Sequence, residues 1–145
     1  MKTVEIYTDG ACSGNPGNGG YCAILIYGGV EKVVSGAEKD TTNNRMELLA
    51  IINALRVLKE KCIVNLYSDS QYVTDAFNQG WISNWLENNW RTASKKEVKN
   101  VDLWKELLEC VNYHTVNFIK VQAHSDNEYN NRCDKIADSE YKKLQ

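Results

Sequence analysis

The chain of 145 residues has little of what usually staples or interrupts a fold. It contains one proline and two histidines, and its five cysteines include no C-x-x-C pair. An odd number of scattered cysteines predicts free thiols, and so few histidines argue against a structural zinc site. No apolar run approaches the roughly 20 residues of a membrane-spanning helix, and the N-terminal segment lacks a signal-peptide core. We therefore expect a single domain, residues 1–145, in the cytoplasm and without a membrane partner.

Positive charge is also scarce. The net charge is −2 and the pI is about 5.7, so the overall balance gives no support to nucleic-acid binding. The distribution of charge matters more than its sum, and the segment from Arg91 to Lys99 has four basic residues and one acidic residue. A basic loop on an acidic body is a weak indication of a polyanionic partner, and a solvated surface turn explains it as well.

The hydrophobic pattern predicts strands first and helices later. Alternation and β-branched residues predict an antiparallel meander of three strands, Thr3–Cys12, Tyr21–Tyr27 and Glu31–Ala37, with a turn-rich segment, Ser13–Gly20, after the first. Apolar residues at helical spacing then predict helices over Asn44–Lys59, Ser70–Gln79, Gly80–Trp85, Val101–Val111 and Glu128–Leu144. Short strands are predicted between them, at Ile63–Tyr67 and Thr115–Val121. This order predicts an α/β fold in which parallel strands extend the meander.

Two of the predicted strands end in the same way, with a tyrosine, a hydroxyl residue, an aspartate and a small residue. The aspartates are Asp9 and Asp69, and they meet at one edge of the sheet if their strands are parallel neighbours. Two close carboxylates resist ionising together unless a cation lies between them, and hard oxygen ligands favour Mg²⁺ or Mn²⁺. Either aspartate alone could instead form an Asx turn or a helix cap.

Three further polar residues do not stand out by propensity. Glu47 lies in the first turns of a predicted helix, where it could simply interact with the helix dipole. Asp134 could be a surface residue near a helix start, and His124 could be an incidental loop histidine. Their interpretation depends on the wider set of motifs.

Taken together, the motifs resemble those of the type 1 ribonuclease H family. The matching stretches run in family order along nearly the whole chain: Tyr7–Gly10 with Gly14–Gly17, Thr41–Leu48, Ser68–Val73, Trp81 with Ile82 and Trp85, Val98–Trp104, and Arg132–Asp134. The resemblance implies a ribonuclease H-like fold, with a five-stranded mixed sheet flanked by about five helices. It also implies an endoribonuclease that hydrolyses the RNA strand of RNA–DNA hybrids and leaves 5′-phosphate and 3′-hydroxyl ends.

The resemblance assigns roles to individual residues. Four carboxylates match the ligands of two Mg²⁺ ions, for which Mn²⁺ could substitute: Asp9, Glu47, Asp69 and Asp134. His124 matches a loop histidine that assists deprotonation of the attacking water or product release. Such a site would clamp the attacking and leaving oxygens of the phosphodiester between two cations. We expect the enzyme to be a monomer.

The resemblance also implies contacts to both strands of a hybrid. The positions expected in the groove, where the RNA 2′-hydroxyl is sensed, are Cys12, Asn15, Asn43, Asn44 and Gln71. Thr42 and Asn100 match phosphate contacts to the DNA strand, and Trp81 matches an aromatic residue along the DNA backbone. Core packing is the alternative for the tryptophans and is the interpretation we favour for Trp104.

Several positions depart from the family pattern without touching the predicted metal ligands. Asp40 stands where relatives often have a basic residue, the stretch Leu86–Asn89 is less basic than usual, and Ala123 replaces a common glycine. These changes predict modest hybrid affinity that falls early with salt. Three alternatives stay open: a resolvase or integrase core that acts on DNA, a non-catalytic hybrid-binding module, and a ribonuclease H domain from a polymerase polyprotein.

Overall fold

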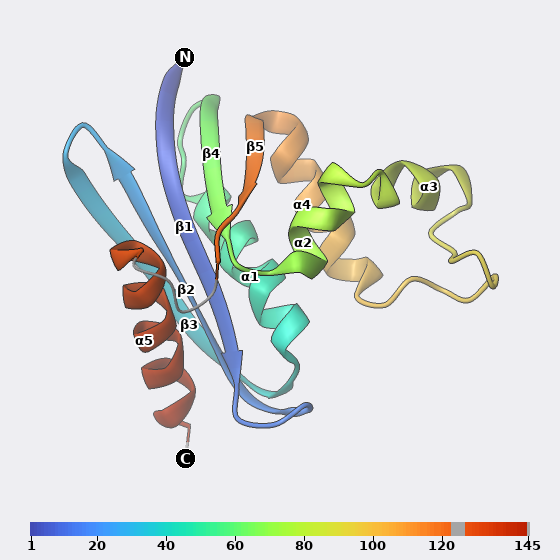
Figure 1. The fold of residues 1–145 in the computed structure, drawn as a ribbon, viewed down its shortest axis with the longest axis horizontal. Helices are drawn as coiled ribbons and strands as arrows, with labels where there is room; N and C mark the ends of the chain where they lie inside the picture. Colours follow the sequence, from blue (N-terminus) through green and yellow to red (C-terminus); the bar gives the residue numbers. More distant parts are fainter. Residues whose placement is uncertain (123–126, 145) are drawn as a thin grey trace.

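The computed structural model describes residues 1–122 and 127–144, which form a five-stranded mixed sheet with helices on both faces (Figure 1). The strand order is β3-β2-β1-β4-β5. The strands are β1 (Lys2–Cys12), β2 (Gly17–Tyr27), β3 (Val30–Thr41), β4 (Cys62–Ser68) and β5 (Thr115–Lys120). The first three form an antiparallel meander, while β4 pairs parallel to β1 and β5 parallel to β4. The predicted fold class is therefore confirmed.

The helices are α1 (Asn43–Arg56), α2 (Gln71–Asn78), α3 (Trp81–Glu87), α4 (Val101–Tyr113) and α5 (Glu128–Lys142). Successive residues of a strand point to opposite faces, so one strand serves two cores. In β2, Ala23 and Leu25 belong to the large core that includes α1, whereas Cys22 and Ile24 pack with residues of α5. Helix α4 packs on α1, and α3 with the loop after it extends away from the sheet (Figure 1). No helix in the described ranges is both long and apolar enough to cross a membrane.

Local capping explains where the two helices nearest the sheet edge begin. Thr42 Oγ1 accepts a hydrogen bond from the Arg45 backbone N–H at the start of α1, and Ser70 Oγ accepts one from the Val73 N–H at the start of α2. In both cases the hydroxyl satisfies a free N–H of the first helical turn. Trp104 is fully buried, which confirms its predicted core position.

The prediction of a turn over Ser13–Gly20 is wrong in its second half, because β2 already begins at Gly17. Gly19 and Gly20 pair with the end of β1, and β3 continues to Thr41 beside them. A Cβ on Gly19 would lie 2.6 Å from the Thr41 side chain, and one on Gly20 would overlap the Ala137 carbonyl oxygen in α5. These glycines therefore permit close packing across the sheet, a role that the sequence does not distinguish from turn formation.

Candidate active site

The two aspartates that end similar strands do lie at one edge of the sheet. β1 and β4 pair in parallel with Tyr7 opposite Tyr67 and Thr8 opposite Ser68, so Asp9 and Asp69 follow at equivalent positions. Asp9 is buried in β1, and its Oδ1 accepts a hydrogen bond from the Gly10 N–H at 3.0 Å. Asp69 directly follows β4 and is half-buried. The register therefore supplies the proximity that the paired sequence motifs predicted.

Glu47 joins these aspartates because α1 passes unusually close to β1. A Cβ on Gly10 would lie 2.6 Å from the Glu47 backbone nitrogen and 2.7 Å from the Met46 carbonyl carbon, so only glycine fits there. One ligand oxygen from each of Asp9, Glu47 and Asp69 lies within 4.8 Å of the others. The sequence analysis gave Gly10 no role, although a glycine directly after a strand aspartate is a recognisable sign of close backbone approach.

Asp134, in the second turn of α5, faces the same cavity of about 300 Å³. The lining residues are Asp9, Gly10, Asn43, Asn44, Glu47, Asp69, Ser70 and Asp134. All four predicted metal ligands and two predicted groove contacts therefore meet in one hollow. They come from β1, α1, the end of β4 and α5, which places segments from both ends of the chain at a single site.

The cluster is electrostatically costly without a cation. Burial raises the pKa of Asp9 well above its usual value, and the charges of Glu47, Asp69 and Asp134 raise it further. Burial is also the main cause of the raised pKa of Glu47, followed by the charge of Asp69. The pKa of Asp69 is raised by burial and then by the charge of Asp134. Such like-charged groups favour a shared proton or a bound cation.

The hydrogen bonding of Glu47 Oε2 indicates whether a cation fits the site. Glu47 Oε2 is buried and has no hydrogen-bond partner among residues 1–122 and 127–144. A buried carboxylate oxygen without a donor is rare because its lost hydration is not replaced. The Glu47 carboxylate, with those of Asp9 and Asp69, forms an all-oxygen donor set of the kind that Mg²⁺ or Mn²⁺ prefers. The residues present therefore fit a divalent cation.

The other predicted groove residues do not line the hollow but belong to segments next to its lining residues. The Asn15 side-chain oxygen accepts a hydrogen bond from the Asn43 N–H at 3.2 Å, which ties the β1–β2 loop to the start of α1. Cys12 Sγ donates to the Thr41 carbonyl oxygen at 3.4 Å and is half-buried. Gln71 is the first residue of α2 and is exposed, two residues after Asp69. Their contact with a nucleic acid stays a prediction.

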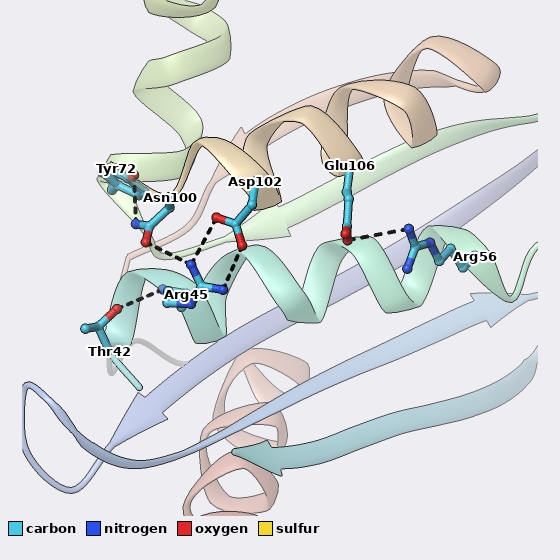
Figure 2. A network of polar contacts seen from close by, with 7 residues as sticks. All are labelled: Thr42, Arg45, Arg56, Tyr72, Asn100, Asp102 and Glu106. Carbon is cyan, nitrogen blue, oxygen red and sulfur yellow. Dashed lines mark hydrogen bonds and ion pairs between the residues drawn. The ribbon is translucent and has the colours of Figure 1, made fainter. Parts of the chain in front are cut away.

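The remaining predicted contacts lie along α1, α3 and the start of α4. Thr42 caps α1, and Asn100 precedes α4 in a left-handed conformation with φ of 61°. Asn100 belongs to a polar network around Arg45, a residue to which the sequence analysis assigned no role (Figure 2). Trp81 begins α3, and its ring centroid lies 6.3 Å from that of Trp85. It is half-buried and is not among the residues that line the carboxylate hollow. His124 lies outside the described residues.

Comparison with known proteins identifies the family. The family model described as RNase H matches residues 1–142. A protein named Ribonuclease H from Acetivibrio thermocellus is 64% identical over 143 residues, covering 99% of this chain and 97% of the relative. Another, from Caldanaerobacter subterraneus, is 61% identical over 98% of this chain and 93% of its own length.

Solved structures agree with the fold. The crystal structure of LC9-RNase H1, described as a type 1 RNase H with the type 2 active-site motif, matches with a TM-score of 0.89 and 28% identity over all of this chain and 74% of the other. LC11-RNase H1, solved in complex with an RNA/DNA hybrid, matches with a TM-score of 0.72 and 22% identity over 97% and 98% of the two chains. With a family match over nearly its whole length and relatives above 60% identity, this chain belongs to the ribonuclease H family.

Proposed function

We propose that this chain is an endoribonuclease that hydrolyses the RNA strand of RNA–DNA hybrids at the carboxylate hollow. The observation that carries the proposal is the cluster of Asp9, Glu47 and Asp69, with ligand oxygens within 4.8 Å of one another and two of the three side chains buried. High identity to proteins named Ribonuclease H supports the reaction. The hybrid bound by a protein of the same fold supports the substrate class.

The charge of the hollow supports a site for two Mg²⁺ ions, with Mn²⁺ as a substitute. Four ionised carboxylates, those of Asp9, Glu47, Asp69 and Asp134, would nearly balance two divalent cations and leave open positions for phosphate and water. When bound, the ions would activate the attacking water and stabilise the leaving oxygen of the phosphodiester. Glu47 Oε2, which lacks a partner among residues 1–122 and 127–144, supports a cation at this site.

The chain's own residues hold the reacting groups in place. The backbone of β1 and the Gly10 N–H fix the Asp9 carboxylate, and the close α1–β1 contact fixes Glu47 beside it. Since a cation held by the carboxylates would activate the water, the RNA 2′-hydroxyl would be free to act as a recognition group instead of a nucleophile. The expected products are 5′-phosphate and 3′-hydroxyl ends. We assign His124 the assisting role that the resemblance implies, in water deprotonation or product release.

Strand choice would come from small and amide side chains around the hollow. Asn43 and Asn44 line the hollow. In the sequence, Cys12, Asn15 and Gln71 lie close to residues that line it. These side chains suit the minor groove, where the 2′-hydroxyl distinguishes RNA from DNA. The DNA backbone would be contacted by Thr42, Asn100 and Trp81. Backbone contacts depend on the shape of the hybrid more than on its sequence. We therefore expect weak sequence preference.

The site draws all of its proposed ligands from one chain, which supports a functional monomer. All five cysteines are free thiols, and three of them are buried. Free thiols are typical of a reducing compartment, which supports our proposal that the enzyme works in the cytoplasm.

The decisive test is cleavage of an end-labelled RNA–DNA hybrid in Mg²⁺, beside duplex DNA and single-stranded RNA. We expect cuts only in the RNA of the hybrid. Asp69→Asn should abolish them, whereas Asp75→Asn, a change in the neighbouring helix α2 outside the hollow, should leave them in place. Cleavage of duplex DNA would instead indicate a resolvase or integrase activity, and hybrid binding without cleavage would indicate a binding module.

A further inference from the structure

The α1–α4 interface contains a polar network that the carboxylate site does not explain. The Arg45 guanidinium forms two hydrogen bonds with Asp102, Nη1 to Oδ1 at 3.2 Å and Nη2 to Oδ2 at 3.0 Å (Figure 2). Its Nη1 also donates to Asn100 Oδ1 at 3.3 Å. The Asn100 Nδ2 in turn donates to the Tyr72 hydroxyl, which also accepts from Trp104 Nε1. The network therefore connects α1, the start of α4 and the start of α2.

This network fixes which way the Asn100 amide points. Arginine has only donors, so the amide oxygen must face Arg45 and the nitrogen must face Tyr72. Asn100 is the N-cap position of α4, yet its side chain makes no capping hydrogen bond. The Asn100 side chain is held instead by Arg45 and Tyr72. One N–H of Nδ2 remains without an acceptor among the described residues and is available to a ligand.

Two residues of the network lie close in sequence to carboxylates of the hollow. Arg45 precedes Glu47 by two residues, and residues two apart on a helix point in different directions, so α1 presents Glu47 to β1 and Arg45 to α4. Tyr72 lies three residues after Asp69. The distance from Asn100 to the carboxylates is therefore set by short, rigid segments. Trp104, which bonds Tyr72, is completely buried and anchors the arrangement in the core.

We propose that Arg45 is a positioning residue, which orients the Asn100 amide so that its N–H, and not its oxygen, faces the DNA-strand phosphate. This inference rests on the proposed function. Without Arg45, the amide can rotate by half a turn and present its oxygen to the phosphate, which would repel it. Lysine also has only donors, but its single ammonium group on a flexible chain cannot bond both Asp102 oxygens and Asn100 Oδ1 in one fixed geometry. Arg45→Lys should therefore leave the amide free to turn.

The interface offers a matched control. Arg56 and Glu106 form a second α1–α4 ion pair, at 3.5 Å, near the other end of α1 (Figure 2). Arg56→Lys makes the same chemical change on the same pair of helices, but Arg56 contacts none of the network residues. Any effect of Arg45→Lys that Arg56→Lys shares reflects the stability of the interface. An effect specific to Arg45→Lys reflects its position.

The experiment measures cleavage of one hybrid by the wild type, Arg45→Lys, Asn100→Ala, the double variant and Arg56→Lys. We expect KM to rise about tenfold for Arg45→Lys with kcat nearly unchanged, since a charge-assisted contact is lost from substrate binding. The double variant should be no worse than Asn100→Ala, because both changes remove one contact. Arg56→Lys should keep the wild-type KM. Asp102→Asn, which loosens the fork but keeps Arg45, should raise KM in the same direction.

Interference mapping tests whether the contact that depends on Arg45 is a contact to a DNA phosphate. Single methylphosphonates, placed at each position of the DNA strand in turn, remove one phosphate charge. In the wild type, we expect one position at a fixed offset from the cut to raise KM, and Arg45→Lys to lose that sensitivity. An unchanged KM and interference pattern in Arg45→Lys would contradict the inference. So would multiplicative effects in the double variant, which would mean that Arg45 contacts the hybrid directly. A wild-type chain that cuts no hybrid would contradict the proposed function itself.

Discussion

Helix α1 has two charged side chains, two residues apart, that meet opposite electrostatic environments. Glu47 enters a buried cluster of like charges, with one oxygen unpartnered among the described residues. Arg45 reaches a carboxylate of opposite sign in a half-exposed network in which each donor faces an acceptor. The first region is unfavourable as it stands, and the second is self-sufficient.

The difference separates a region that can bind a ligand strongly from a region that fixes the orientation of side chains. A cluster of unpaired carboxylates destabilises the folded protein, and a bound cation restores that stability. Such a cluster is therefore suited to bind a cation. A satisfied arginine–carboxylate fork gains little free energy near the surface, but it sets directions and distances. The predictions below, from the largest expected effect to the smallest, test this contrast.

Asp69→Asn should lower kcat for hybrid cleavage by about a thousandfold or more, because it removes a proposed ligand from the metal site. The same change should abolish most of the rise in melting temperature that Mg²⁺ gives the wild type. Cleavage assays and thermal melts with and without EDTA measure both effects. An Mg²⁺-induced rise as large in the variant as in the wild type would contradict the metal assignment.

Gly10→Ala should destabilise the protein by about 2–3 kcal/mol and reduce cleavage strongly, since the new Cβ forces α1 away from β1 and displaces Glu47. Gly36→Ala is the control. The atoms nearest to its Cβ would all belong to the Tyr21 side chain, which can move, so we expect a smaller loss of stability and normal kcat. Urea unfolding and cleavage of the hybrid compare the two. Equal effects would mean that the α1–β1 contact has no special importance.

Glu47→Gln should abolish cleavage and yet stabilise the metal-free protein, by on the order of 1–2 kcal/mol at pH 8. The change removes a buried carboxylate that is surrounded by like charges and has one oxygen without a hydrogen-bond partner among the described residues. Glu106→Gln, which breaks the exposed pair with Arg56, should slightly destabilise instead. Melting in EDTA gives the sign of each change. A destabilised Glu47→Gln variant would show that the carboxylate is already compensated within the protein.

The metal-free protein should lose stability as the pH rises. Because the pKa values of Asp9 and Glu47 are raised on folding, the folded state binds more protons than the unfolded state above their usual values near 4. The free energy of unfolding therefore falls from about pH 4 through neutral pH. Saturating Mg²⁺ should flatten this decline, which melting curves across the pH range can measure. A metal-free stability that rose over this range would contradict the electrostatic account of the hollow.

Arg45→Lys should change stability least, by less than about 1 kcal/mol, because solvent screens a pair in which Asp102 is largely exposed. Arg56→Lys should have a similar or smaller effect. Differential scanning calorimetry of both variants measures it. A loss of several kcal/mol for Arg45→Lys alone would mean that the network stabilises the fold itself, and its proposed role in positioning would then need the kinetic data to stand.

Much of the fold followed from local signals. The order of strands and helices and the buried position of Trp104 were predicted, because hydrophobic periodicity acts over a few residues. The turn predicted over Ser13–Gly20 failed in part because glycine serves both turns and close packing. Only the neighbours of Gly20 in α5 distinguish the two, and they lie more than a hundred residues away in the chain.

The sequence by itself determined the family, the order of the elements and the candidate carboxylates, since each depends on residue types at short spacing. The tertiary structure decided which carboxylates converge, how deeply Glu47 is buried and that Arg45 finds its partner 57 residues away in Asp102. Charge and hydrogen-bonding capacity belong to a residue, but the pKa, the unpartnered oxygen and the orientation of an amide belong to its surroundings. Those surroundings exist only once the sheet has brought β1 beside β4 and the helices have packed upon it.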